Sequence, residues 1–143
     1  RAIAQTPQWR NKLESLEDFI RQLPPQETPI THWFSRGVYA REMAIPTGTL
    51  ITGRIHKYSQ INVLLQGEVS VLMEGGVKRI KAPYIYEAPP GTKRAVFVHA
   101  DARWLTICGT HTTDTDVLED ELTAGSYQEY EAFCASLMHD KGD

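Results

Sequence analysis

Arg54 and His56 stand two residues apart at the end of a β-type run, and both side chains can take part in chemistry. Alternate residues of a strand face the same side, so we expect the two to point the same way. Histidine can bind a metal or carry a proton. Arginine is permanently cationic and has donors but no lone pair, so it recognises anions instead. Gln60, Asn62 and Arg94 add further hydrogen-bonding groups.

The spacing of these residues follows a two-part pattern. The first part runs Gly48, five residues, Arg54-Ile55-His56, three residues, Gln60, six residues, Gly67, and the second runs Pro89-Pro90-Gly91, two residues, Arg94, three residues, Val98. The pattern resembles the two motifs of the cupin superfamily and covers about residues 37–109. The resemblance implies a small jelly-roll β-barrel, or double-stranded β-helix, with positions 54, 56, 60 and 94 in its interior.

In metal-bearing cupins these positions carry three histidines and one glutamate, a set that suits a divalent first-row metal. Here they read Arg54, His56, Gln60 and Arg94. Two arginines repel a divalent cation, so we expect a degenerate metal site and no cofactor. The alternative is a divalent metal in a shifted site, which would combine His56 with His99, Gln60 or Asn62.

Arg54 and Arg94 need negative charge near them, because an isolated buried ion costs several kcal/mol. One candidate is an internal carboxylate, Glu42, Glu68 or Glu87. A second is a small anionic molecule, a carboxylate or phosphate, bound by Arg54, His56, Gln60, Asn62 and Arg94. A third alternative is that the arginines extend to the barrel mouth. The sequence leaves these alternatives open.

Three functions therefore compete. The first is a binding module for a small anionic molecule. The second is a phage or prophage structural or interaction protein that uses the barrel as a scaffold, because the runs Gly53–Lys57, Ala82–Tyr84 and Pro89–Arg94 resemble uncharacterised cupin-like proteins of tailed bacteriophages. The third is a cupin isomerase, epimerase or dioxygenase, with His56 as the proton carrier. No carboxylate stands at a matched position to orient His56, and we lean away from an enzyme.

Short β-type runs separated by turn residues fill about residues 34–110, and their number favours a sandwich or barrel. The predicted strands are Val38–Ile45, Thr49–Ile55, Ile61–Leu65, Val69–Met73, Val77–Lys81, Tyr84–Glu87, Lys93–His99 and Arg103–Cys108. Tyr84 and Tyr86 share one face of their strand. We expect them to pack in the core, with a place in the pocket wall as the alternative.

Helical patterns flank the barrel. Apolar residues at three- and four-residue spacings predict a helix over 7–23, and Pro24, Pro25 and Pro29 end it. A helix capped by Thr115 or Asp116 and ending at Leu122 is predicted after the barrel, followed by a second helix capped by Ser126. The expected organisation is a helix and connector over 1–33, the barrel over 34–110 and a helical extension over 111–143.

Composition excludes several classes of protein. Hydrophobic residues make up 41% and charged residues 23% of the chain, and no run approaches the roughly 18 apolar residues that span a bilayer. A net charge of -3 gives no reason to expect nucleic-acid binding. Cys108 and Cys134 lack metal or redox spacing, which favours the cytoplasm, a host's if phage-encoded. Open barrels commonly pair through edge strands, so we expect a homodimer.

Overall fold

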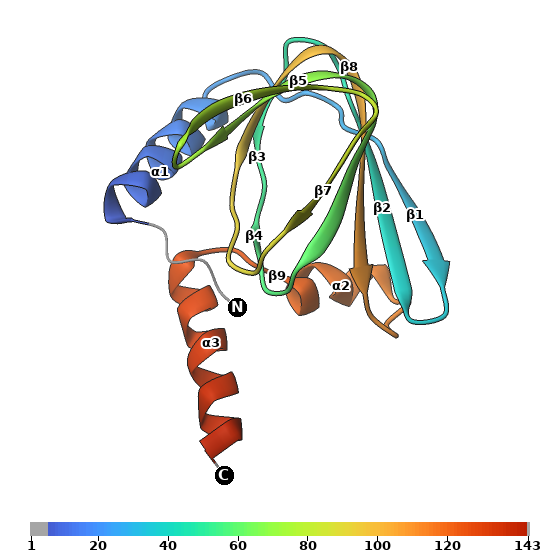
Figure 1. The fold of residues 1–143 in the computed structure, drawn as a ribbon. Helices are drawn as coiled ribbons and strands as arrows, with labels where there is room; N and C mark the ends of the chain where they lie inside the picture. The colour runs from blue at the N-terminus through green and yellow to red at the C-terminus, as the bar shows by residue number, and fades with distance from the viewer. Residues whose placement is uncertain (1–5, 143) are drawn as a thin grey trace.

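Two long strands, β5 (Gln60–Met73) and β8 (Ala95–Gly109), organise the barrel in the computed structural model, which describes residues 6–142. Both belong to one seven-stranded sheet, and each pairs with different strands along its two halves. The first half of β5 pairs with β7 (Tyr84–Ala88), and its second half pairs with β6 (Gly76–Lys81). The strand thus bends from one layer of the barrel into the other, as Figure 1 shows.

β8 bends in the same way. Its first half pairs with β3 (Leu50–Thr52) and its second half with β2 (Val38–Ile45). β1 (Ile30–Ser35) extends the sheet beyond β2, which gives the antiparallel order β1-β2-β8-β5-β6. The predicted fold class, a mainly β barrel with helices before and after it, is confirmed.

Gly67 explains why β5 is one strand where the sequence predicts two. The break predicted between the strands Ile61–Leu65 and Val69–Met73 is wrong, because the chain continues through Gln66 and Gly67 with shifts of register against β8. Gly67 has a φ of +96°, and a Cβ there would lie 2.5 Å from the backbone oxygen of Asp101. A glycine with positive φ in a strand commonly marks a bulge and a close backbone approach. The residue bends the strand and does not end it.

β1 lies mostly in the segment predicted as a proline-rich connector. The last of its prolines, Pro29, precedes the strand, so no missing amide interrupts the pairing with β2. All six residues of β1 are exposed, and Trp33 is 55% exposed. β1 is therefore an open edge strand. Self-association through it stays a prediction.

Helix α1 (Pro7–Arg21) begins at the cap Thr6 and lies beside β3 (Figure 1). Leu13 is its buried residue. Glu17 accepts hydrogen bonds from Thr52 Oγ1 at 2.9 Å and from Lys93 Nζ at 2.7 Å, and Lys93 is only 6% exposed. The buried lysine thus has its own carboxylate.

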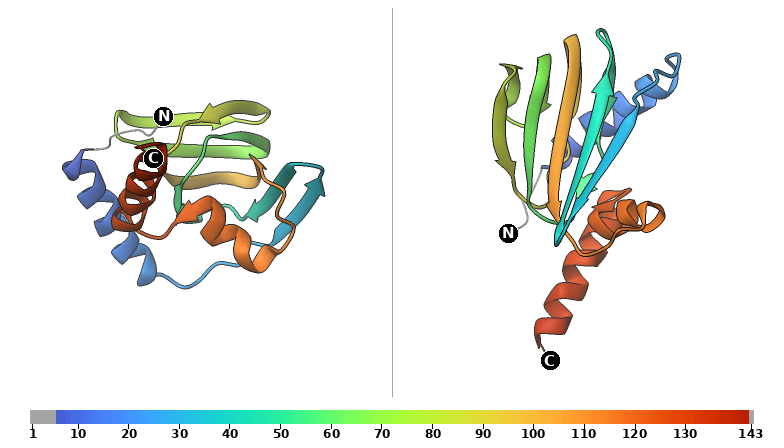
Figure 2. Two further views of the ribbon diagram at one scale, coloured as in Figure 1. Left: turned by 90° about the horizontal axis from the view of Figure 1, so that it is seen from below. Right: turned by 90° about the vertical axis from the view of Figure 1, so that its right-hand side faces the viewer.

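The two predicted C-terminal helices are present. Helix α2 (Thr115–Leu122) is capped by Asp114 and not by the predicted Thr115 or Asp116, because the Asp114 side chain accepts from the Asp116 amide. β9 (Thr123–Ala124) follows the helix and pairs with β4 (Ile55–His56). Helix α3 (Tyr127–Gly142) starts at Ser126, whose Oγ accepts from the Glu129 amide. Figure 2 shows α2 near one open end of the barrel and α3 extending away from it.

The other end of the barrel holds the main apolar core, which consists of Ile45, Leu64, Val69, Val71, Ile80, Val98 and Ala102. Cys108 and Cys134 are free thiols, and a cytoplasmic location stays a prediction. Among residues 6–142 no helix is long and apolar enough to cross a membrane.

Candidate functional site

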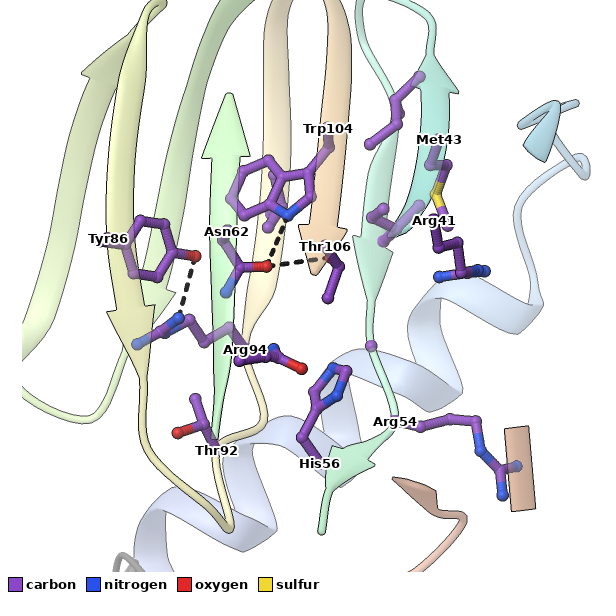
Figure 3. A pocket seen from close by; sticks show the side chains of 15 residues that line it. Arg41, Met43, Arg54, His56, Asn62, Tyr86, Thr92, Arg94, Trp104 and Thr106 are labelled. Carbon is purple, nitrogen blue, oxygen red and sulfur yellow. Dashed lines mark hydrogen bonds between the residues drawn. The ribbon is translucent and has the colours of Figure 1, made fainter. Parts of the chain in front are cut away.

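The end of the barrel near β4 contains a cavity of about 120 Å³, named here the inner cavity. It lies between strands β2, β5, β7 and β8 (Figure 3). Its lining residues are Arg41, Met43, Ile45, Ile51, Gly53, Arg54, His56, Gln60, Asn62, Tyr86, Thr92, Arg94, Val96, Trp104 and Thr106.

Strand alternation supplies the wall. On β5, Gln60 and Asn62 share the inward face, and Asn62 stands opposite Tyr86 of β7 and Thr106 of β8. The structure thus confirms that Tyr86 can line a pocket, whereas Tyr84 packs against the apolar core. The inward residues at this end are polar, while those farther along the same strands are apolar.

Asn62 is fixed in one orientation. Its Oδ1 accepts from Trp104 Nε1 and from Thr106 Oγ1, both at 3.0 Å (Figure 3). An indole nitrogen is only a donor, so the oxygen of the amide must face it. The Nδ2 group is buried and has no hydrogen-bond partner among the described residues, in a side chain that is 2% exposed. Asn62 therefore presents an unused donor.

Gln60 has an unpartnered hydrogen-bond acceptor, whereas Asn62 has an unpartnered donor. It is 7% exposed, and its Oε1 is a buried acceptor that lacks a partner within the described part of the chain. Buried polar atoms are nearly always hydrogen-bonded, so each exception asks for a cause. Gln60 and Asn62 thus place two unpartnered buried polar atoms on neighbouring inward positions of one wall.

Arg94 enters the cavity as predicted. Its Nη1 donates to Tyr86 Oη at 3.0 Å, and its guanidinium lies 4.9 Å from the centre of that ring. No carboxylate pairs with Arg94 among the residues that the structure describes. The adjacent Lys93 faces the other way and has Glu17. Of these two neighbouring cations, Lys93 has a carboxylate partner and Arg94, which faces the inner cavity, has none among the described residues.

Arg41 is a second cavity cation, which sequence reasoning missed. It lies on β2 opposite Thr106, on the same inward face as Met43. Like Arg94, it forms no ion pair with any described carboxylate. The signal was available, because Val38–Ile45 is predicted as a strand and alternation puts Arg41 on one face with Tyr39 and Met43.

His56 lies between these cations. Burial, followed by the positive charges of Arg41 and Arg94, lowers the pKa of His56 to about 4. The imidazole is therefore neutral at pH 7. The same burial raises the pKa of Tyr86, against the opposing effect of Arg94.

Arg54 contradicts the expectation that it points inward with His56. It borders the cavity, but its guanidinium extends away toward α2 (Figure 3). It lies 3.4 Å from Glu119 and from Asp120, and its Nε donates to Thr123 Oγ1 at 2.7 Å. The regular strand begins only at Ile55, so strict alternation does not extend back to Arg54.

Arg54 belongs instead to a set of contacts that ties α2 to the barrel. Lys57 Nζ donates to the Asp120 carbonyl at 2.6 Å, and the Lys57 amide donates to the Leu122 carbonyl at 2.9 Å. We name this set, Arg54, Lys57, Glu119, Asp120 and Thr123, the α2 clasp. Its charged side chains are all paired or hydrogen-bonded.

The internal partners expected for the arginines are wrong. Glu42 pairs with Arg103, and Glu68 pairs with Arg79. Glu87 is exposed on the outer face of β7, opposite Ile61. All three carboxylates lie on strand positions that face away from the inner cavity or outside it, so they leave its charge uncompensated.

His99 does not join His56. Its Nε2 is 2.6 Å from Ser70 Oγ, and its ring contacts Phe97, away from the residues that line the inner cavity. Over the described residues, no group of three or more His, Cys, Asp or Glu side chains could hold a metal. The shifted site is therefore not assembled from His56 and His99.

A second space of about 330 Å³, named here the outer chamber, adjoins the inner cavity. The two share Arg41, Met43, Ile51, Gly53, Arg54, His56 and Thr106 as lining residues. The wall of the outer chamber also includes Ile30 of β1, Tyr39 of β2, and Leu118 and Leu122 of α2. Helix α2 therefore covers a space that is continuous with the barrel interior.

Comparison with solved structures shows the cupin fold. The protein assigned as ethanolamine utilization protein Q of Salmonella typhimurium is 20% identical, with a TM-score of 0.52, over 62% of this chain and 73% of that one. An RmlC-like cupin of Methanocaldococcus jannaschii with a double-stranded β-helix is 12% identical, with a TM-score of 0.51, over 61% and 84%. KdgF of Halomonas sp. is 18% identical, with a TM-score of 0.50, over 64% and 82%.

No family model matches the sequence, and no curated protein matches it either. At these identities the structural likeness shows the fold alone. The resemblance to phage and prophage proteins stays a prediction.

Proposed function

We propose that the inner cavity binds a small organic anion at Arg94, with Arg41 adding positive charge from the other side of His56. The observation that carries the proposal is a pair of cavity guanidiniums that both lack a carboxylate partner among the described residues. Both side chains are partly exposed, but a cation shielded from water without a counter-charge still raises the energy of the folded state. A bound carboxylate or phosphate removes that cost and accepts the planar donors of arginine in pairs.

The neutral groups of the wall support the same ligand. Asn62 Nδ2 is an unused donor, and Tyr86 accepts from Arg94, so its own O–H proton remains available. Anion oxygens can accept from each of these groups. Arg94, Asn62 and Tyr86 therefore offer donors on one side of the cavity, while Arg41 lies on the other side of His56 (Figure 3).

The residues present do not fit a resident divalent metal. Of the four positions matched to the metal ligands of cupins, only His56 offers an ordinary ligand nitrogen, and Arg41 and Arg94 both act on it electrostatically. A divalent metal ion in the cavity would add positive charge near Arg41 and Arg94, which already lack a described carboxylate partner. The guanidinium of Arg54 points out of the cavity, but Arg41 lines the cavity and contributes a positive charge that the motif does not predict.

The titratable groups favour binding over proton transfer in the unliganded protein. A general base or acid works best with a pKa near the working pH. The pKa of His56 is about 4, and that of Tyr86 is raised above its ordinary value of 10.0. Both groups are thus neutral and far from their titration range at pH 7.

The test is calorimetric titration of the purified chain with acetate, lactate and inorganic phosphate at low salt. We expect Arg94→Met to weaken binding at least about tenfold, which corresponds to about 1.4 kcal/mol. Arg41→Met should weaken binding less, because Arg41 acts from the other side of His56. The control is Arg36→Met, which removes an exposed arginine from the turn after β1. Absence of binding by all three anions, or equal binding in all four proteins, would overturn the proposal.

A further inference from the structure

We infer that the ligand is a hydroxy carboxylic acid whose uncharged, apolar substituent extends from the inner cavity into the outer chamber beneath α2. This inference rests on the proposed anion site and adds the ligand's class. Three features carry it: the unused acceptor of Gln60, the size of the inner cavity, and the lining of the outer chamber.

Gln60 favours a ligand that carries a donor as well as an acid group. Its Oε1 is buried without a described partner, and a carboxylate has no hydrogen to give it. An ammonium donor is disfavoured, because Arg41 and Arg94 already place two positive charges at this cavity. A hydroxyl is a neutral donor that satisfies Gln60 without adding charge.

The two unused groups stand on one face of β5. Gln60 and Asn62 are two residues apart, which places their Cα atoms about 7 Å from each other on a strand. A carboxylate oxygen that accepts from Asn62 Nδ2 and a hydroxyl that donates to Gln60 Oε1 then fit within one small molecule. This complementarity distinguishes a hydroxy acid from a simple carboxylate or phosphate.

The inner cavity limits the size of this head. An apolar cavity of about 150 Å³ accommodates benzene, with its six non-hydrogen atoms. The inner cavity of about 120 Å³ therefore has room for a hydroxy acid head of about that size and not for a larger body. Any substituent must continue into the adjoining outer chamber.

The outer chamber suits an uncharged, apolar substituent. Tyr39, Leu118 and Leu122 belong to one buried cluster with Cys108, and all four line the chamber. The lysine and arginine side chains in its lining are Arg41, which faces the inner cavity as well, and Arg54, which is paired with Glu119. The chamber thus offers apolar contacts without a further unpaired cation.

The experiment is calorimetric titration with four probes: propionate, lactate, 3-phenylpropionate and 3-phenyllactate, with both enantiomers of the hydroxy acids. We expect 3-phenyllactate to bind at least about tenfold more tightly than 3-phenylpropionate, because its hydroxyl can donate to Gln60 Oε1. We also expect it to bind at least about tenfold more tightly than lactate, because its ring buries apolar surface in the outer chamber.

Two variants assign these preferences to their residues. Gln60→Leu should reduce the preference for the hydroxyl nearly to unity, and replacing an unpaired buried acceptor by an apolar group of similar shape should not unfold the protein. Ile30→Gln, on the exposed edge strand, should weaken 3-phenyllactate while leaving lactate unchanged. Urea unfolding of both variants checks that they are folded.

The outcomes separate the two levels of the proposal. Equal binding of hydroxy and plain acids, or a hydroxyl preference that survives Gln60→Leu, overturns the inference while anion binding stands. Equal binding of lactate and 3-phenyllactate overturns the place of the substituent. If none of the four acids binds, and phosphate does not bind either, the inference fails together with the proposed function.

Discussion

The inner cavity and the α2 clasp lie side by side, share Arg54 at their border, and use arginine in opposite ways. In the clasp, Arg54 contacts Glu119, Asp120 and Thr123. In the cavity, Arg41 and Arg94 lack a described carboxylate. One region has completed its polar contacts within the chain, and the other has not.

The difference shows which region is structural and which is suited to a ligand. Polar groups whose partners come from the same chain contribute to the folded state and need nothing else. Unpaired buried groups raise the energy of the folded state and are retained at functional sites at the expense of stability. The four predictions below test this contrast by stability measurements, from the largest expected effect to the smallest.

Leu118→Ala should lower the free energy of unfolding by about 3 kcal/mol. Leu118 is fully buried against Tyr39, Cys108 and Leu122, and truncation of a buried leucine typically costs about 2–5 kcal/mol. Urea unfolding measures the change. The control is Val117→Ala on the exposed side of the same helix, expected within about 0.5 kcal/mol of the parent protein. Equal effects of the two variants would show that α2 is not fastened by its apolar face.

Acidification should destabilise the protein through His56, which lines the inner cavity. The pKa of His56 is about 4 when folded and near 6.5 when unfolded, so the unfolded chain takes up a proton first. The free energy of unfolding should fall by about 3 kcal/mol as the pH drops from about 6.5 to 4. Denaturant titrations at several pH values measure this slope. His56→Asn should remove it.

Glu121, which joins α2 to the end of β8, titrates in a different window. Hydrogen bonds from Thr110 and Thr112 lower the pKa of Glu121 below its ordinary value of 4.5. The stability it contributes is present above that value and is lost as the pH falls through the lower, folded pKa. A slope between pH 6.5 and 4.5 that persists in His56→Asn would contradict the assignment to the cavity.

The sequence predicts the polar end of the barrel because strand periodicity and motif spacing depend on local order. Those signals correctly place His56, Gln60, Asn62 and Arg94 around one space. They misplace Arg54, because the backbone before Ile55 is irregular and α2, more than 60 residues later, supplies the carboxylates. Arg41 was missed because the motif has no position on β2. Local patterns in the sequence cannot reveal contacts with residues that are distant along the chain, such as those between Arg54 and α2.

β1 shows the same limit for the fold. Three prolines in 24–29 predict a connector, and the strand that begins at Ile30 is stabilised by pairing with β2. Pairing is a tertiary contact that outweighs local propensity. Gly67 likewise looks like a turn residue in the sequence, and only its close approach to Asp101 shows that it forms a bulge.

Arg41→Met should make the unliganded protein more stable by about 1 kcal/mol at pH 7. The variant removes a cation that has no described counter-charge and keeps an unbranched apolar side chain of similar length. It also removes one of the causes that lower the pKa of His56, so the acid slope should become smaller. Urea unfolding at pH 7 and pH 5 measures both effects. A loss of more than about 1 kcal/mol, compared with Arg36→Met, would mean that Arg41 is a structural residue.

Arg54→Met should have the smallest effect and the opposite sign, a loss of about 0.5 kcal/mol. Its two carboxylate partners are exposed, Glu119 at 64% and Asp120 at 87%, and ion pairs in contact with water contribute little. Because salt screens such pairs, the loss should shrink between 0.1 M and 1 M NaCl. Arg103→Met, which removes the arginine from the Glu42 pair on the outer face, is the matched control.

The same variant also decides whether the clasp and the cavity act independently. Arg54 contributes no charge to the space between Arg41 and Arg94, so Arg54→Met should leave the affinity for lactate within about twofold, whereas Arg94→Met should abolish most of it. Calorimetry on the two variants gives both numbers. A loss of affinity in Arg54→Met as large as in Arg94→Met would mean that Arg54 contacts the ligand directly. The α2 clasp and the inner cavity would then not be separate structural and ligand-binding regions.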